Sequence, residues 1–302
     1  MFKKCSRIVQ KFAVSINLCY CGAWPFFPEN VSGLISAETK RYKNNRFCMK
    51  KVHALAKNGP RSSGKTTLGK LLSKLANSPA VIHIDTSKIL EWVMDRHGTL
   101  GKELTKFKPN MARGFYTPDE LVIPAAEMWL KCNVQDRPDV TQLIWTGWCR
   151  TRGQIGFLAA NFKDYDVTYT PMSDEECIQT TMRRNELEGP RPDGTLEALQ
   201  THLRECREKT IPTMTAREYA HKILTLDFNH SLTHRLSQSA GLIQAPTHIR
   251  HRIRTALQNP EHWIHEEIAR IEKGNPRRNH VTSPQVLPAH RVHDGPIHVS
   301  CR

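Results

Sequence analysis

The stretch that decides the fold is Gly59-Pro60-Arg61-Ser62-Ser63-Gly64-Lys65-Thr66. It fits the pattern G-x-x-x-x-G-K-[ST], which is typical of a phosphate-binding loop. Its glycines let backbone N–H groups approach an anion closely, and the helix that follows offers its unpaired N–H groups and the positive end of its dipole. In this motif Lys65 reaches the β- and γ-phosphates of a nucleotide and the hydroxyl of Thr66 faces Mg²⁺.

The residues on both sides of the loop supply the context that the motif needs. Residues 51–56 predict a short strand, and residues 68–75 place apolar side chains at helical spacing. A chance match in a linker rich in Lys, Ser and Gly would lack this order of strand, loop and helix. We therefore interpret the stretch as a real phosphate-binding loop.

The middle of the chain alternates strands with helices. Further strands are predicted at residues 81–88, 143–145, 166–170 and 222–228. Helices are predicted near residues 89–93, 117–131, 154–161, 173–189, 195–219 and 229–242. This alternation predicts an α/β fold in which helices flank a parallel β-sheet.

Charge and cysteine content limit the binding partners and the cellular compartment that we expect for the chain. The chain has 302 residues and a net charge of +15, and two-thirds of that excess lies in residues 1–48 and 243–302. A basic balance can indicate nucleic acid or an anionic membrane, but we favour solvated, flexible ends around a phosphate-binding core. The nine cysteines have irregular spacing, and no apolar run approaches the ~18 residues of a membrane span. We expect a cytoplasmic monomer that binds small-molecule nucleotides, and neither membrane nor nucleic acid.

The two ends of the chain, residues 1–48 and 243–302, differ from the expected domain at 49–242. For residues 1–48 three interpretations stay open: a transit-like or secretory leader, a disordered extension, or a mis-called start upstream of Met49. Residues 243–302 contain one expected helix, 246–273, and then a basic tail rich in Pro and His. His262 and His265 lie three residues apart there, and a solvated amphipathic helix is favoured over a metal site because a second ligand pair is missing.

Four ordered segments between residues 49 and 242 together resemble the adenylate kinase family of nucleoside monophosphate kinases. The loop at 59–67 is similar to the family's nucleotide loop, and residues 86–90 occupy the place of its T-G-D-x-L segment. Residues 114–122, Gly-Phe-Tyr-Thr-Pro-Asp-Glu-Leu-Val, resemble G-x-x-V-P-D-E-x-V, and residues 147–154 resemble G-F-P-R-T-x-x-Q. Arg183 and Arg191 are similar to the arginines around a short lid, at about residues 184–191.

The resemblance implies a P-loop kinase that uses ATP and Mg²⁺ in the reaction ATP + NMP → ADP + NDP. It implies that ATP is bound by loop residues Gly59, Arg61, Ser62, Ser63, Gly64, Lys65, Thr66 and Thr67, with Thr66 on the metal. It implies an acceptor site that includes Thr86, Gly147, Arg150 and Gln154. Lys65, Arg150, Arg183 and Arg191 would be the catalytic cations, because phosphoryl transfer depends on charge clamping.

Several positions depart from the family pattern. Thr146 stands where the family has an Asp that orients the Mg²⁺ shell, although Asp85 could compensate. Glu91, Gln179 and His202 stand at positions where the family has arginines. Two alternatives to a nucleoside monophosphate kinase therefore stay open. One is a diverged nucleotide-binding protein without kinase activity, whose basic ends contact a partner such as RNA, and the other is a P-loop kinase for another small acceptor.

Overall fold

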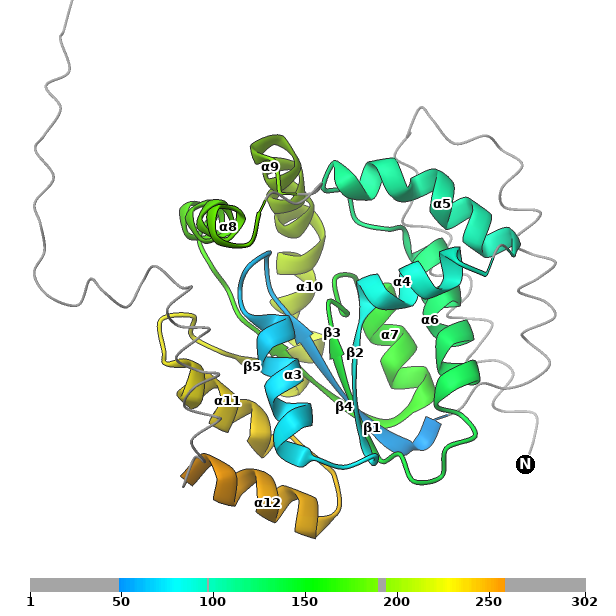
Figure 1. Cartoon of the computed structure of the whole chain (residues 1–302), viewed down its shortest axis with the longest axis vertical. Coiled ribbons are helices and arrows are strands. Elements are labelled where there is room, and N and C mark those ends of the chain that lie inside the picture. The colour runs from blue at the N-terminus through cyan, green and yellow to red at the C-terminus, as the bar shows by residue number, and fades with distance from the viewer. Residues whose placement is uncertain (1–48, 97, 190–193, 259–302) are drawn as a thin grey trace, which may run out of the picture. The chain divides into compact units, whose positions relative to one another are not determined.

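The computed structural model describes residues 49–96, 98–189 and 194–258 (Figure 1). Within these residues five parallel strands form one sheet in the order β2-β3-β1-β4-β5. The strands are β1 (Met49–Asn58), β2 (Val81–Asp85), β3 (Gln142–Thr146), β4 (Phe162–Tyr169) and β5 (Ile223–Thr225). The predicted α/β fold with a parallel sheet flanked by helices is confirmed.

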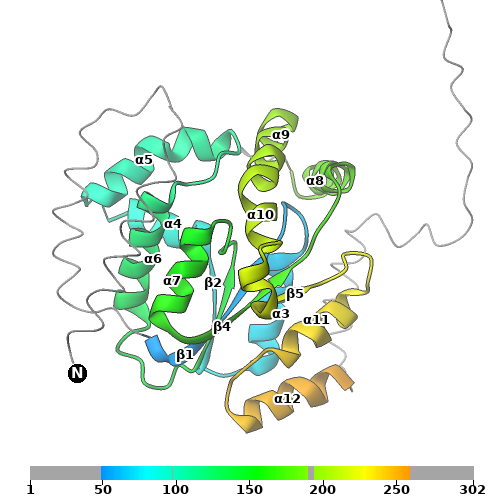
Figure 2. The ribbon, with the colours of Figure 1, turned by 180° about the vertical axis from the view of Figure 1, so that it is seen from behind.

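Helices cover both faces of the sheet. Those of the described residues are α3 (Lys65–Ala76), α4 (Thr86–Met94), α5 (Thr99–Ala112), α6 (Asp119–Asn133), α7 (Arg152–Asn161), α8 (Asp174–Glu188), α9 (Leu196–Glu205), α10 (Ile211–Met214), α11 (Leu232–Gly241) and α12 (Thr247–Gln258). A π-helical turn, η1 (Cys206–Thr210), joins α9 to α10, and a 3₁₀ segment, η2 (Arg217–Lys222), precedes β5. Helices α3, α11 and α12 lie on one face (Figure 1), and α6, α7 and α10 lie on the other (Figure 2).

The core on the α3 side follows from alternation along β1. Leu55 points toward α3, where Leu68 and Leu72 are also fully buried, and Leu236 of α11 joins the same cluster. Helix α12 belongs to this core as well, because its Ile249 and the neighbouring Ile253 pack in it. Burial of these aliphatic side chains holds α3 in place behind the phosphate loop, at about 25 cal/mol per Å² of apolar area removed from water.

Aromatic side chains fill the opposite side beneath the turn that follows β3. The rings of Trp145 and Trp148 are stacked with centroids 4.1 Å apart, and Phe157 of α7 meets both edge to face. The indole N–H of Trp148 donates to the backbone oxygen of Gln154 at 3.0 Å, so the one polar group of this buried ring has a partner. The cluster gives the turn at 147–151 a rigid support.

The region from 195 to 228 differs most from expectation. The single helix predicted over 195–219 is confirmed as far as Met214: the backbone is helical through α9, η1 and α10, with a π-helical turn inside it, and the 3₁₀ segment η2 follows after a break. The last strand, predicted at 222–228, covers only Ile223–Thr225. Helix α5 was not predicted, because only Leu100, Gly101 and Leu104 of its residues are buried and the apolar pattern is correspondingly sparse.

Residues 1–48 and 259–302 lie outside the described residues, so the interpretations of the N-terminal stretch, of the helix beyond Gln258 and of His262 and His265 fall there. Among the described helices, none combines the length and apolar character that crossing a bilayer requires.

One charged side chain, Lys57, is buried where β1 enters the phosphate loop. It is 1% exposed, and its Nζ donates to Thr168 Oγ1 at 3.2 Å and to Ser239 Oγ at 2.9 Å. Burial, together with the positive charge of Arg235, lowers the pKa of Lys57 to about 7. Lys57 thus ties β1 to β4 and α11 largely through neutral hydrogen bonds above that pH.

We expect Lys57→Met to stabilise the protein at low pH more than at high pH. The unfolded lysine has an ordinary pKa of 10.5 and the folded one about 7, so the unfolded state binds the extra proton between these values. Wild-type stability therefore rises with pH across this window, and the penalty is fully present below pH 7. The gain from the substitution should be larger by about 2 kcal/mol at about pH 6.5 than at about pH 9. Urea unfolding at both pH values measures this, with exposed Lys74→Met as the control; equal gains at both pH values would contradict it.

Candidate functional site

The phosphate loop has the backbone that its sequence requires. Gly59 and Gly64 have positive φ values of 146° and 83°, and a Cβ at Gly59 would lie 2.6 Å from the oxygen of Thr170. Ser62, where the family loop has glycine, also takes a left-handed φ of 61°, and its hydroxyl meets Thr181 Oγ1 of α8 at 3.0 Å. The loop therefore keeps its shape with a serine that also contacts α8.

Lys65 lies over this loop at the first position of α3. Its Nζ donates to the carbonyl oxygen of Pro60 at 2.5 Å and to Ser63 Oγ at 3.3 Å. Burial, followed by the charge of Arg150, lowers the pKa of Lys65 to about 8. The ammonium is thus mostly charged near neutral pH and faces a second cation, an arrangement that favours an anion between Lys65 and Arg150.

A carboxylate that could share a metal ion lies beside Thr66. Asp85 Oδ2 accepts hydrogen bonds from Thr66 Oγ1 at 3.0 Å and from Thr146 Oγ1 at 2.9 Å. Burial opposes ionisation of Asp85, but hydrogen bonds from Ser87, Thr146 and Thr66 outweigh it and hold its pKa below the usual value. Asp85 and Thr146 are directly paired at the ends of β2 and β3, so the acid that position 146 lacks is present on the neighbouring strand.

This set of oxygens fits Mg²⁺. Among the described residues no group of three or more His, Cys, Asp or Glu side chains forms a metal cluster. Mg²⁺ needs no such cluster, because it is usually bound by one or two carboxylates, waters and substrate phosphates. One ionised carboxylate beside a threonine hydroxyl at a phosphate loop meets that description.

A hydrogen-bonded chain supports Asp85 from behind. His83 Nε2 lies 3.3 Å from Thr146 Oγ1. The single Thr146 proton goes toward Asp85 or the Ile84 oxygen, both acceptors, so His83 is the donor in this contact. Burial lowers the pKa of His83 to about 4, which keeps the imidazole neutral.

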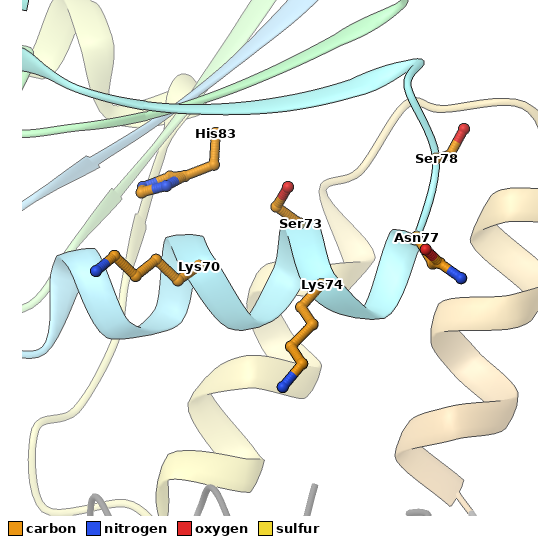
Figure 3. A pocket seen from close by; sticks show the side chains of 6 residues that line it. All are labelled: Lys70, Ser73, Lys74, Asn77, Ser78 and His83. Atoms are coloured by element: carbon orange, nitrogen blue, oxygen red, sulfur yellow. The ribbon is translucent and has the colours of Figure 1, made fainter. Parts of the chain in front are cut away.

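Figure 3 shows the His83 side chain directed at α3, where it borders a hollow of about 500 Å³ along that helix. Close approach is possible because residue 69 is glycine: a Cβ there would lie 2.6 Å from His83 Nε2. The other residues that line this hollow, along α3 and the turn after it, are Lys70, Ser73, Lys74, Asn77 and Ser78. The hollow is connected to the site through His83, which lines it and also contacts Thr146.

Arg150, the arginine expected on the acceptor side, follows an unusual turn after β3. Gly147 and Cys149 have positive φ values of 78° and 66°, which turn the chain so that Arg150 lies beyond the strand end. Asn58 fixes this turn to the phosphate loop: its Nδ2 donates to the oxygen of Cys149 at 2.7 Å and its Oδ1 accepts from Gly59 N at 2.7 Å. The guanidinium of Arg150 lies 4.5 Å from the ring centre of Tyr116.

Two of the expected acceptor-site residues use their polar atoms within the protein. Gln154 is buried, accepts from Arg150 N at 2.9 Å and donates to Asp119 Oδ1 at 2.9 Å. Thr86 donates to the oxygen of Thr146 and accepts from the indole of Trp145, each at 3.1 Å. In this arrangement both side chains position the turn that carries Gly147 and Arg150.

Helices α8 and α9 lie beyond the carboxyl ends of the strands (Figure 1). Arg183 is a partly exposed residue of α8, and residues 184–188 of the expected lid belong to the same helix. Arg191 lies outside the described residues. Glu91 projects from α4 and pairs with Lys88 at 2.6 Å, so its carboxylate is engaged at the surface.

His202 on α9, another position where the family has an arginine, is buried against Tyr116. It is 6% exposed, its ring meets that of Tyr116 edge to face with centroids 5.2 Å apart, and its Nε2 has no hydrogen-bond partner among the described residues. Burial and the charges of Arg150, Arg61 and Lys65 push the pKa of His202 well below its ordinary value. It therefore shares the electrostatic field of the three cations around the loop.

Sequence reasoning missed Asn58 and His83 as parts of the site. An asparagine directly before the first loop glycine, and a histidine two residues before Asp85 on a buried strand, are the only signals for them. Their roles depend on contacts across 91 and 63 residues of chain, so no local pattern reveals them.

Comparison with known proteins supports a distant relationship to adenylate kinase. The chain is 29% identical over 115 residues to the adenylate kinase of Mycoplasma pneumoniae (strain ATCC 29342 / M129 / Subtype 1). The match covers 38% of this chain and 50% of the relative, so the chain spans about half the length of the protein it matches. No family model matches the chain. A nucleotide kinase is the activity to which this likeness points.

Proposed function

We propose that the protein transfers the γ-phosphoryl group of ATP to a nucleoside monophosphate. The observation that carries the proposal is the opposition of Lys65 and Arg150 across the carboxyl end of a parallel sheet, where ligands of open α/β sheets bind. The charge of Arg150 contributes to lowering the pKa of Lys65, and Thr66 donates to Asp85 beside the loop. The adenylate kinase likeness supports the same class of reaction.

In this proposal each side chain has a defined task. The backbone N–H groups of the loop from Arg61 to Lys65 bind the β-phosphate, and the Lys65 ammonium exchanges its bond to Pro60 for the β- and γ-phosphates. Arg150 holds the acceptor phosphate, with Tyr116 beneath its guanidinium. Thr66 and Asp85 would hold Mg²⁺, which when bound neutralises charge on the β- and γ-phosphates. Arg183 and Arg191 are candidates for closing over the transferring group.

A second candidate is phosphoryl transfer to the hydroxyl of another small acceptor. Two observations favour it. Glu91, on α4, is an exposed acid at a position where the family has an arginine for the acceptor phosphate. Asp85, at the end of β2 directly before α4, is an ionised carboxylate. A hydroxyl acceptor needs a base that takes its proton. It needs fewer cations around it than an acceptor phosphate, because it carries no negative charge.

A coupled assay for ADP formation tests both candidates. ATP with Mg²⁺ is combined with AMP, CMP, UMP or GMP, and in parallel with sugars and other alcohols. We expect turnover with at least one monophosphate. Phosphorylation of an alcohol alone would favour the second candidate, and ATP binding without any phosphorylation would contradict both.

That last outcome would favour a nucleotide-binding protein whose basic ends contact RNA. Its test is salt-dependent RNA binding that disappears when residues 1–48 and 259–302 are deleted. The second deletion begins at 259 because α12, which ends at Gln258, packs in the core on α3.

A further inference from the structure

We propose that Arg235 on α11 is a positioning residue for the phosphate loop, which holds the carbonyl of Ser63 outward so that the N–H of Gly64 faces a bound phosphate chain. The assignment rests on the proposed function, in that it places a phosphate chain in this loop. It concerns a side chain that follows Ser63 by 172 residues and belongs to no motif of the sequence.

The first observation is a hydrogen bond from a buried cation to the backbone of the loop. Arg235 is 5% exposed, and its Nη1 donates to the oxygen of Ser63 at 3.2 Å. The same nitrogen lies 3.5 Å from the place that a Cβ on Gly64 would take, so the guanidinium lies against the peptide that joins Ser63 to Gly64. A charged donor makes such a bond stronger than a neutral one would, and burial makes it costly to break.

The second observation is the direction in which this peptide faces. A trans peptide is planar, and its C=O and N–H point in opposite directions. Because the carbonyl of Ser63 points at α11, the N–H of Gly64 points away from that helix. On its other side Gly64 is fixed by α3, since its carbonyl accepts from Leu68 N at 2.9 Å. Gly64 is therefore held at both of its peptides, with its N–H turned from the helix that holds it.

The third observation is that α11 is itself anchored and presents Arg235 in one place. Ser231 caps the helix, and its carbonyl accepts from Arg235 N at 3.0 Å. The ring centre of Phe228 lies 5.2 Å from the guanidinium. One turn after Arg235, the Ser239 hydroxyl accepts from Lys57 near the end of β1. Helix α11 thus bonds both to the strand that enters the loop and to the loop itself.

Such a support should matter for binding. A loop that already has its bound shape loses less conformational freedom when the ligand arrives, so it binds more tightly. The guanidinium of Arg235 stays charged at every working pH and polarises the peptide in the sense that makes Gly64 N–H a better donor. Loss of Arg235 should weaken the binding of a phosphate chain that this side chain does not touch.

Three substitutions separate positioning from packing. Arg235→Met keeps an unbranched side chain and removes both the donor and the charge, and Arg235→Lys keeps a charged donor. Ser239→Ala is the matched control, because Ser239 is buried on the same helix and bonds to β1 instead. Isothermal titration calorimetry with tripolyphosphate and with ATP measures affinity. Circular dichroism melting shows whether each variant is folded.

Nuclear magnetic resonance can observe the loop peptide directly. The dipeptide Ser-Gly occurs in this chain only at 32–33 and 63–64. Cell-free synthesis with ¹³C at the serine carbonyl and ¹⁵N in glycine therefore gives only two signals in a carbonyl-to-amide correlation spectrum. Ser32→Ala removes one of them and so identifies the other. The signal that remains reports the Ser63 carbonyl and the Gly64 N–H together.

We expect Arg235→Met to weaken tripolyphosphate and ATP binding about 10-fold, the effect of one hydrogen bond of ordinary strength. Arg235→Lys should stay within about 3-fold of the wild type, because it keeps a charged donor. Ser239→Ala should bind as the wild type does, even where its melting temperature falls. The Gly64 amide should shift when tripolyphosphate binds to the wild type, and the Ser63 carbonyl signal of free Arg235→Met should differ from that of the free wild type.

A packing role predicts a different pattern. Arg235→Met would then melt earlier and, once folded, bind tripolyphosphate as the wild type does with an unchanged Ser63 carbonyl signal; that result would overturn the inference. An equal loss of affinity in Ser239→Ala would also overturn it, because it would show a general loosening of α11. Should Arg235→Met not fold, Arg235→Gln takes its place with the same outcomes, since its shorter side chain ends before the Ser63 oxygen.

Because tripolyphosphate has no base and needs no acceptor, these results are independent of the acceptor assay. Binding that depends on Arg235, without phosphorylation of any monophosphate, would contradict the proposed function and leave the positioning role standing. Turnover of a monophosphate with phosphate binding unchanged in Arg235→Met would do the reverse. A wild-type protein that binds neither tripolyphosphate nor ATP would overturn both.

Discussion

Lys65→Ala should lower kcat/KM for phosphoryl transfer by about 10³-fold or more while leaving the fold intact. The ammonium is the cation of the loop that would meet the β- and γ-phosphates, and loss of one well-placed charge of this kind removes several kcal/mol of transition-state stabilisation. The fold should survive because the hydrogen bonds of the Lys65 ammonium go to Pro60 and Ser63 within the loop itself. ADP formation in the coupled assay and ATP affinity by calorimetry measure the effect.

The matched control is Lys74→Ala, an exposed lysine on the same helix. Its turnover should equal that of the wild type. The pH dependence adds a second check: wild-type ATP affinity should fall as the pH rises through about 8, where Lys65 loses its proton, and Lys65→Ala should lack this step. Unchanged turnover in Lys65→Ala would remove this residue from the mechanism.

Asp85→Asn should raise the Mg²⁺ concentration needed for half-maximal activity and lower turnover at saturating ATP by about 10²-fold. The amide keeps the size of the side chain and removes the charge that a divalent ion requires, in a buried place where charge matters most. The single oxygen of asparagine can accept either from Thr66 and Thr146 or from Ser87 at the start of α4, so we expect some loss of stability and assay the variant below its melting temperature. Activity against Mg²⁺ concentration measures the shift.

Two comparisons sharpen this prediction. Asp164→Asn removes a half-exposed carboxylate that pairs with Lys222 on the same sheet, and it should leave the Mg²⁺ requirement unchanged. Binding of ATP without Mg²⁺ should be equal in Asp85→Asn and wild type, since Lys65 and the loop remain. The same Mg²⁺ requirement in Asp85→Asn as in wild type would show that Asp85 is no metal ligand.

The loop and the sheet could be predicted because their signals are local. Glycines at 59 and 64 are needed for left-handed backbone, and apolar runs on either side show the helical and strand periods directly. The helix expected over 195–219 is present from Leu196 to Met214, but its apolar spacing showed neither the π-helical turn inside it nor the 3₁₀ segment that follows. At the end of η1 the Thr210 hydroxyl meets Tyr116 Oη at 3.2 Å and donates to the oxygen of Arg150 at 3.4 Å, contacts that no local pattern announces.

The sequence shows which positions depart from the adenylate kinase pattern. Only the structure shows which other residues lie close enough to those positions to compensate. Thr146 looked like a lost metal ligand, but strand pairing places Asp85 beside it and within hydrogen-bond distance of both threonines. His202 looked like a lost arginine, and the fold buries it among the remaining cations with Nε2 unpaired in the described residues.

By itself, then, the sequence determined a glycine-containing loop between a strand and a helix of a parallel α/β sheet, because turn chemistry and hydrophobic period act over a few residues. The tertiary structure alone decided what faces that loop: Asn58 on the Cys149 turn, His83 behind Asp85, and His202 among Arg61, Lys65 and Arg150. Those contacts join residues far apart in the chain, and burial makes their charges and hydrogen bonds strong enough to matter. That is why spacing along the chain could not show them.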